Sequence, residues 1–273
     1  MLQSEFASII DKPHFVDKTF MIRLIFDLLL RKPNTSKSSS SVTVFGSQLA
    51  KNDPILLTAP RRFGKTTNID MLKCFFGGFV AKEIFRDLKI GKYEEAMKCW
   101  NKFHVVYVTF GHCCGVIESY RDGVNACRSI LHKTFTNFNY IKSTLSKTNI
   151  VAFNDWVDEK KYLNKEDLEI GTGLEFLVRC VVEYSNNEKP ILLLIDEFDR
   201  ICSKAMFNTK NADTLNKIIT FYCDMVGEAI KHESSCLTVL TGVAAITCKG
   251  LSGTNNIDYI NSLNMKHLWK FTG

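Results

Sequence analysis

An eight-residue run between Ala59 and Thr66, APRRFGKT, has the residue types that bind a chain of phosphates. Phosphates need several backbone N–H groups that point inward, and a helix N-terminus supplies them together with the positive end of its dipole. Gly64 lets the backbone turn tightly beside a phosphate, Lys65 can reach the β- and γ-phosphates, and the Thr66 hydroxyl can bind magnesium. The run therefore predicts a phosphate-binding loop.

The run departs from the usual eight-residue pattern at its first two positions. That pattern opens with glycine, where this chain has Ala59, and Pro60 removes one backbone N–H donor. Both changes lie away from the N–H groups nearest the phosphates. We therefore predict a P-loop that binds ATP with Mg²⁺, against the alternative of an ordinary basic turn between a strand and a helix. The predicted nucleotide-binding residues are contiguous: Ala59, Pro60, Arg61, Arg62, Phe63, Gly64, Lys65, Thr66 and Thr67.

Two of these residues, Arg61 and Arg62, have several roles open to them. They can bind phosphate, pair with carboxylates of the same domain, or face a partner subunit. Only the last role would make either residue an arginine finger. The sequence does not choose among the three.

A second run, ILLLIDEFD at Ile191 to Asp199, ends an apolar strand in two adjacent carboxylates. Burying them costs free energy unless they face a metal or solvent at the edge of the sheet. In a P-loop protein the aspartate after this strand holds magnesium, a role that falls to Asp196. Glu197 is placed to polarise the attacking water as general base. The alternative is a pair of helix-capping acids, and for Asp199 and Arg200 we expect only a local ion pair or a surface contact.

A third candidate is Thr241, at the tip of a further apolar strand. A polar residue there can sense the γ-phosphate or orient the attacking water. A threonine that only satisfies the backbone at a strand end is nearly as good an interpretation.

The elements that must position these residues follow from hydrophobic patterns. Continuous apolar runs predict strands at Ile55–Ala59, His104–Phe110, Ile191–Ile195 and Leu237–Thr241. Periodic apolar residues predict helices at Thr19–Arg31 (capped by Asp17), Thr66–Phe76, Val116–Phe138, Leu174–Tyr184 and Ala212–Lys231. The stretch Asn139–Gly173 is polar and is expected to be irregular, and Pro33–Ser41 is expected to be a flexible surface loop. Alternating strands and helices predict an α/β fold with a mostly parallel central sheet flanked by helices.

Composition narrows the class of protein without naming a substrate. The net charge of +6 allows a nucleic-acid partner but does not argue for one. The ten cysteines contain no C-x-x-C pair, so zinc knuckles are not expected, and buried, reduced thiols are. No signal peptide or membrane-spanning segment is recognisable, so we expect an intracellular protein of the cytoplasm or nucleus without a membrane partner.

Taken together, these runs resemble the AAA-ATPase-like P-loop family, whose bacterial members often carry a PD-(D/E)XK nuclease-like domain at the C-terminus. The resemblance implies a P-loop NTPase fold of the additional-strand type, with the sensor strand between the two motif strands, and it implies ATP binding and hydrolysis. The similar phrases occur in order: FVDKTFMI at 15–22, TAPRRFGKTTNIDMLKCFF at 58–76, IFRDLKI at 84–90, LLLIDEFD, LTGVAAIT at 240–247 and GLSGTNNIDYI at 250–260.

The resemblance also implies a division of the chain. Residues 1–45 are expected to form an N-terminal helical segment with a serine-rich loop, and residues 46–273 the P-loop ATPase core. The family's helical lid and nuclease-like part would follow residue 273, so nuclease activity is not expected and hydrolysis without a lid is open. The alternatives are a nucleotide-dependent binding module without turnover and a DNA-directed ATPase from a mobile element. A homo-oligomer is left open.

Overall fold

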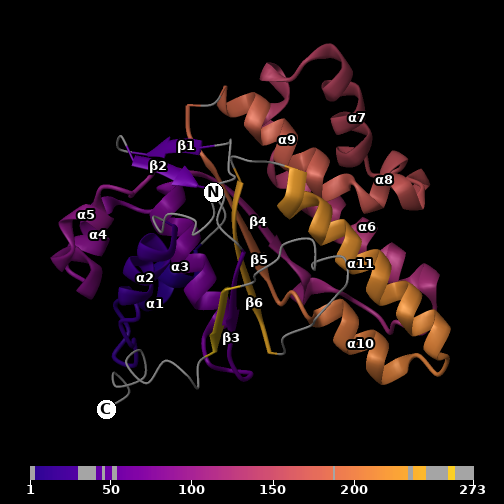
Figure 1. The fold of residues 1–273 in the computed structure, drawn as a ribbon, viewed down its shortest axis with the longest axis horizontal. Coiled ribbons are helices and arrows are strands. Elements are labelled where there is room, and N and C mark those ends of the chain that lie inside the picture. The colour runs from indigo at the N-terminus through magenta and orange to yellow at the C-terminus, as the bar shows by residue number, and fades with distance from the viewer. Residues whose placement is uncertain are drawn as a thin grey trace.

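A five-stranded sheet in which all neighbouring strands are parallel forms the centre of the computed structural model (Figure 1). The structure describes residues 4–29, 41–44, 47–50, 54–186, 188–232, 236–243 and 258–261. Side by side, the strands are β4 (His104–Thr109), β5 (Ile191–Asp196), β6 (Cys236–Gly242), β3 (Ile55–Thr58) and β7 (Asp258–Asn261). A separate antiparallel hairpin consists of β1 (Ser41–Val44) and β2 (Ser47–Ala50). The predicted α/β fold with a parallel central sheet is confirmed.

Strand β6 lies between the two strands that carry the candidate motifs. Leu240 of β6 is opposite Leu56 of β3 on one side and opposite Ile195 of β5 on the other. This is the strand position that the family resemblance implied. Because parallel strands run in one direction, the residues that follow β3, β5 and β6 meet at one edge of the sheet.

Helices cover both faces of the sheet (Figure 1). One layer contains α1 (Glu5–Ile9), α2 (Phe20–Leu29), α3 (Lys65–Gly77), α4 (Lys82–Arg86) and α5 (Glu94–Met97). The other contains α6 (Tyr120–Asn137), α7 (Lys147–Val157), α8 (Asp167–Gly171), α9 (Gly173–Ser185), α10 (Arg200–Asn208) and α11 (Ala212–His232). Short 3₁₀ segments are η1 (Lys89–Lys92), η2 (Phe110–His112), η3 (Asn139–Thr144) and η4 (Lys161–Asn164).

Strand β5 contributes to the hydrophobic core on both faces of the sheet. Leu193 and Ile195 pack into the core beneath α6, α9 and α11, whereas Leu192 and Leu194 pack against the α1–α3 layer. Successive side chains of a strand point to opposite faces, so a strand covered on both sides needs a continuous apolar run. Asp196, the last residue of β5, is therefore held at the end of a strand that is buried along its whole length.

Helix α3 starts directly after the predicted phosphate-binding run. Its N-cap is Gly64, with φ of 75°, and its C-cap is Gly78, with φ of 67°, whose N–H donates to the carbonyl of Cys74. A Cβ atom on Gly78 would lie 2.5 Å from Cγ of Asn101, so glycine is needed there for space as well as for conformation. The predicted helix differs from α3 by one residue at each end.

The prediction of an irregular segment at Asn139–Gly173 is wrong. The segment folds into α7 and α8 with η3 and η4 beside them. Trp156 of α7 is buried and stacks on Phe135 of α6 with ring centroids 5.0 Å apart, and Phe153 packs against the same ring. A few large aromatic anchors bury these short helices, which leaves too few apolar residues for a visible period.

The predicted N-terminal helix is confirmed as α2 as far as Leu29, and the serine-rich residues 33–40 lie outside the described residues. Asp17 is not its N-cap: its carboxylate accepts the N–H and hydroxyl of Thr19 at 2.8 and 2.7 Å, ahead of the first helical residue.

The described cysteines follow the prediction of buried, reduced thiols with two exceptions, Cys114 and Cys223. Free thiols that are buried are found at Cys74, Cys99, Cys113, Cys127, Cys180, Cys202 and Cys236, and Cys114 is exposed and free. Burial raises the pKa of the Cys74 thiol to about 11, as expected for a thiol that packs as a small hydrophobic group. Cys223 in α11 is disulfide-bonded, so the prediction of reduced thiols does not hold there.

A substitution at Tyr222 of α11 tests how much its hydrogen bond to the segment after β5 contributes to stability. Its buried hydroxyl donates to the carbonyl of Phe198 at 2.6 Å. Tyr222→Phe leaves that carbonyl without its donor and is expected to lower the free energy of unfolding by about 1–3 kcal/mol, as measured by urea denaturation. Tyr140→Phe is the control, because Tyr140 is 60% exposed, and it is expected to change stability by less than about 0.5 kcal/mol. Equal stabilities of the two variants would contradict this role.

Candidate functional site

The run Ala59–Thr66 forms a loop between β3 and α3, which we call the 59–66 loop. Its start is fixed by a hydrogen bond from the N–H of Ala59 to the carbonyl of Gly242 at 3.1 Å, which joins it to the end of β6. Arg62 and Gly64 both have positive φ angles, 66° and 75°. These two left-handed residues turn the chain back so that the first N–H groups of α3 face the loop. The predicted order of strand, loop and helix is confirmed.

Lys65 holds the loop closed in this structure. Its ammonium group donates to the carbonyls of Ala59 and Pro60 at 2.9 and 2.8 Å. Burial lowers the pKa of Lys65, and the nearby carboxylates, Asp199 foremost, oppose that shift. Ala59 and Pro60, which depart from the glycine-first pattern, therefore contribute backbone carbonyl oxygens. The side chain of neither residue removes this oxygen.

The N-terminal segment FVDKT is fastened to the loop. Lys18 donates from Nζ to the carbonyl of Phe63 at 3.3 Å, and Asp17 accepts the N–H of Lys89 at 2.7 Å. Thr19, next in the chain, is fully buried. Three runs that are far apart in the sequence, at 15–22, 58–76 and 84–90, are thus joined by direct contacts. Lys18 was not predicted to be part of the site, although it lies in the run FVDKTFMI, which resembles a segment of the AAA-ATPase-like family.

Asp196, Glu197 and Thr241 come together at the carboxyl edge of the sheet. Asp196 is only 1% exposed, and one of its oxygens accepts the hydroxyl of Thr241. The same hydroxyl oxygen accepts the N–H of Glu197 at 3.3 Å. One buried side chain on β6 therefore fixes the orientation of the first acid and the backbone of the second.

Glu197 has an unusual backbone and a partly exposed carboxylate. Its φ of 50° lies in the left-handed region, which is rare outside glycine and costs on the order of 1 kcal/mol or more. Its side chain is 37% exposed, and a Cβ on Gly111 would lie 3.3 Å from its carboxylate carbon. The strained turn directs the carboxylate away from the core, and Gly111 leaves room for it.

The expectation for Asp199 and Arg200 needs correcting. Arg200 does form a local ion pair, but with Glu197, at 3.7 Å between Nε and Oε2. Asp199 is 6% exposed, which excludes a surface role, and it accepts the N–H of Val243 at 3.1 Å. It links the start of α10 to the residue that follows β6.

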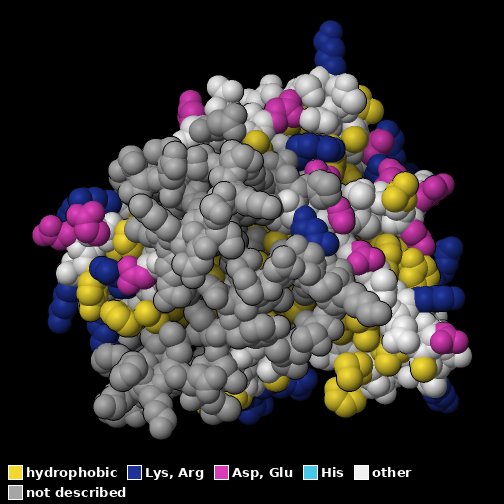
Figure 2. Space-filling model, viewed as in Figure 1, with side chains coloured by type: hydrophobic (Ala, Val, Ile, Leu, Met, Phe, Trp, Pro, Cys, Tyr) yellow, Lys and Arg dark blue, Asp and Glu magenta, His cyan; other side chains and the backbone are white. Residues whose placement is uncertain are grey.

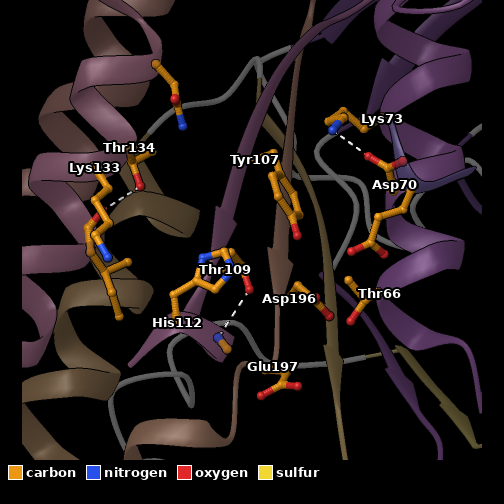
Figure 3. Close-up of a pocket in the computed structure, with 14 residues that line it drawn as sticks. Thr66, Asp70, Lys73, Tyr107, Thr109, His112, Lys133, Thr134, Asp196 and Glu197 are labelled. Atoms are coloured by element: carbon orange, nitrogen blue, oxygen red, sulfur yellow. Dashed lines mark hydrogen bonds and ion pairs between the residues drawn. The ribbon is translucent and has the colours of Figure 1, made fainter. Parts of the chain in front are cut away.

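Two cavities meet at Thr66 and Glu197. The first, which we call the loop cavity, has a volume of about 570 Å³, and the second, the edge cavity, about 380 Å³. Figure 3 shows the edge cavity, where Thr66, Asp196 and Glu197 lie together below Tyr107 of the edge strand β4. The loop cavity is lined by residues from the 59–66 loop and from the opposite wall, including Arg61, Arg62, Lys65, Thr66, Glu197 and Arg200.

The remaining predicted loop residues lie beside this point. The Phe63 ring is 44% exposed, and Thr67 lines a third cavity of about 460 Å³ together with Phe63, Phe15 and Lys18. The predicted nucleotide-binding residues and the predicted acids are therefore neighbours in space, although they are more than a hundred residues apart in the chain.

The oxygen atoms at this point suit Mg²⁺ only together with phosphate. Among the described residues, no cluster of three or more His, Cys, Asp or Glu side chains is arranged to bind a metal. The Thr66 hydroxyl and the Asp196 carboxylate are hard oxygen donors in one cavity. Mg²⁺ is commonly held by one or two protein oxygens while phosphates and waters complete its octahedron, so these two residues fit that ion.

The outer surface of the described residues does not indicate a particular partner. On the face seen in Figure 2, the described Lys and Arg side chains alternate with Asp and Glu, without a continuous basic patch. In the described ranges, no helix is long and apolar enough to cross a membrane.

Thr241 can be tested against another threonine of the same strand. Thr241→Val removes the donor of Asp196 and the acceptor of Glu197 N–H, so we expect a loss of about 1–3 kcal/mol in the free energy of unfolding. Thr238 is equally buried, but its hydroxyl has no hydrogen-bond partner among the described residues. Thr238→Val is therefore expected to be neutral or stabilising in the same denaturation experiment. A Thr241→Val protein as stable as Thr238→Val would show that the hydrogen bonds of the Thr241 hydroxyl do not contribute to stability.

Comparison with known proteins agrees with the resemblance in the sequence. A family model described as Predicted AAA-ATPase matches residues 42–252, which are 211 of the 273 residues. None of the curated proteins and none of the solved structures that were searched matches the chain. Because the family model covers more than half of the chain, including β3 to β6, the 59–66 loop and both acids, the chain belongs to the AAA-ATPase-like family.

Proposed function

We propose that this chain is a P-loop NTPase of the additional-strand type that binds ATP with Mg²⁺ and hydrolyses it to ADP and phosphate. The observation that carries the proposal is the meeting of the 59–66 loop with Asp196, Glu197 and Thr241 at one edge of the sheet. A helix N-terminus with a lysine binds polyphosphate, and an adjacent pair of acids supports metal binding and water activation. The family match supports nucleotide use at a coarser level.

In this proposal the loop residues hold the triphosphate. The N–H groups from Gly64 to Thr67 surround the β-phosphate, and the Lys65 ammonium leaves the Ala59 and Pro60 carbonyls to reach the β- and γ-phosphates. Thr66 and Asp196 are the residues that would hold Mg²⁺. Bound Mg²⁺ would neutralise charge that develops on the phosphate oxygens.

Glu197 is assigned the role of general base. Its carboxylate is partly exposed and faces the cavities on both sides of Thr66, so it can accept a proton from water beside the γ-phosphate. Thr241 is assigned a positioning role, because its hydroxyl fixes both acids and its strand ends beside the loop. A positioned general base typically contributes 10²–10⁴-fold to a rate.

Glu197→Gln separates binding from turnover. The amide keeps the shape of the side chain but cannot take the proton, so we expect kcat for ATP hydrolysis to fall by about 10²–10⁴-fold while ATP binds at least as tightly. Phosphate release and the Kd for ATP are the measurements, and Glu118→Gln, at an exposed position, is the control. An unchanged kcat in Glu197→Gln would remove this residue from the mechanism.

Lys65→Ala tests the phosphate site itself. Loss of the ammonium group is expected to weaken ATP binding by at least about tenfold, as measured by calorimetry. Lys210→Ala, at an exposed position two residues after the end of α10, should leave the Kd unchanged. ATP binding that survives Lys65→Ala unaltered would contradict the proposed site. ATP binding in the wild type without phosphate release would instead favour a nucleotide-dependent binding module.

A further inference from the structure

Arg200 forms part of the wall of the loop cavity that faces the 59–66 loop. It is the first residue of α10, four residues after Asp196, and its side chain is 33% exposed. Lys65, Arg61 and Arg62 line the same cavity from the loop side. The cavity therefore has cationic groups both on the 59–66 loop and at the start of α10, and Arg200 lies three residues after Glu197, which lines the same cavity.

The guanidinium of Arg200 has a buried N–H group without a hydrogen-bond acceptor in the described part of the chain. Its Nε is buried, and among the described residues it has no hydrogen-bond partner. The Glu197 carboxylate is 3.7 Å away, which is too far for a hydrogen bond. An ion pair whose two side chains are 33% and 37% exposed is a weak interaction at this separation. An arginine with unused donors that faces a cavity is well suited to an oxygen-rich anion.

The position of Arg200 relative to Glu197 indicates which phosphate of a bound nucleotide Arg200 would contact. If the proposed function holds, the terminal phosphate lies beside the water that Glu197 activates. The guanidinium of Arg200 lies beside Glu197, with Nε 3.7 Å from Oε2. The β-phosphate, by contrast, would lie at the turn made by Gly64 and Lys65, which line the loop cavity from the 59–66 loop.

We propose that Arg200 binds the γ-phosphate of ATP from within the same chain and thereby makes the site selective for a nucleoside triphosphate over a diphosphate. Paired hydrogen bonds to phosphate oxygens are stronger than the loose contact with Glu197. Binding of the triphosphate therefore replaces the Arg200–Glu197 pair with an Arg200–phosphate pair. The exchange releases the Glu197 carboxylate to face water only when a γ-phosphate is present.

Arg86 supplies a matched control for the ion pair alone. It pairs with Glu83, also three residues apart, at 3.5 Å, outside all the cavities described above. If Arg200 only stabilised the start of α10, then Arg200→Met and Arg86→Met would behave alike toward nucleotides. Thermal unfolding of both variants without nucleotide establishes that each is folded.

The experiment measures Kd by calorimetry, with Mg²⁺, for ADP and for the non-hydrolysable β,γ-imido analogue of ATP. Arg200→Met is expected to weaken binding of the analogue by about 10- to 100-fold, the range of a lost charge-assisted pair, and to change the Kd for ADP by less than about twofold. Arg200→Lys should fall between, because lysine keeps the charge but loses the planar fork. Arg86→Met should leave both values unchanged.

Equal losses for the analogue and ADP, or no loss for either, would overturn the assignment of Arg200 while leaving ATP binding intact. A wild-type protein that binds neither nucleotide would overturn the proposed function and this inference with it. A double-mutant cycle tests the exchange directly. Glu197→Gln should tighten binding of the analogue more in the wild-type background than in Arg200→Met, and equal effects in the two backgrounds would refute the exchange of partners.

Discussion

The hydroxyl of Thr241 joins β6 to the end of β5, where the two acids Asp196 and Glu197 lie. Strand β6 separates these acids from β3 and the 59–66 loop. The hydroxyl donates to Asp196 and accepts from the backbone of Glu197, and it can do so because β6 pairs directly with β5. The parallel order of the sheet sets which strand ends meet, and the hydroxyl fixes how two of them are oriented. The strained backbone of Glu197 is held by this bond and by the bond from Phe198 N–H to the Thr241 carbonyl.

The loop on the other side of β6 depends on a different set of contacts. Its shape comes from two left-handed residues, Arg62 and Gly64, and its outer side is held by Lys18 of the N-terminal segment. Asp17 then fastens the same segment to the start of η1. A loop that must be open to a ligand has little core of its own, so contacts from distant segments supply the rigidity that binding requires.

Much of this arrangement was predictable from the sequence, for identifiable reasons. The apolar run before Asp196 must be a buried strand, and the run before Pro60 must be another, because both are short, continuous and followed by polar residues. The helices of 139–171 were not predictable, since a few aromatic contacts such as Trp156 on Phe135 bury them instead of a periodic apolar face. The Glu197–Arg200 pair was also missed, because a left-handed residue redirects the acid toward α10. Local sequence gives no sign of that turn.

The roles of Lys65, Glu197 and Arg200 all depend on one physical claim, that a nucleoside triphosphate binds where the 59–66 loop meets the ends of β5 and β6. Hydrogen–deuterium exchange with and without the non-hydrolysable ATP analogue and Mg²⁺ tests this claim most directly. The account predicts slower amide exchange at residues 61–68, 196–200 and 241–243, with residues 139–171 unchanged. Exchange that does not slow in the loop, or that slows only in the helices of 139–171, would contradict it.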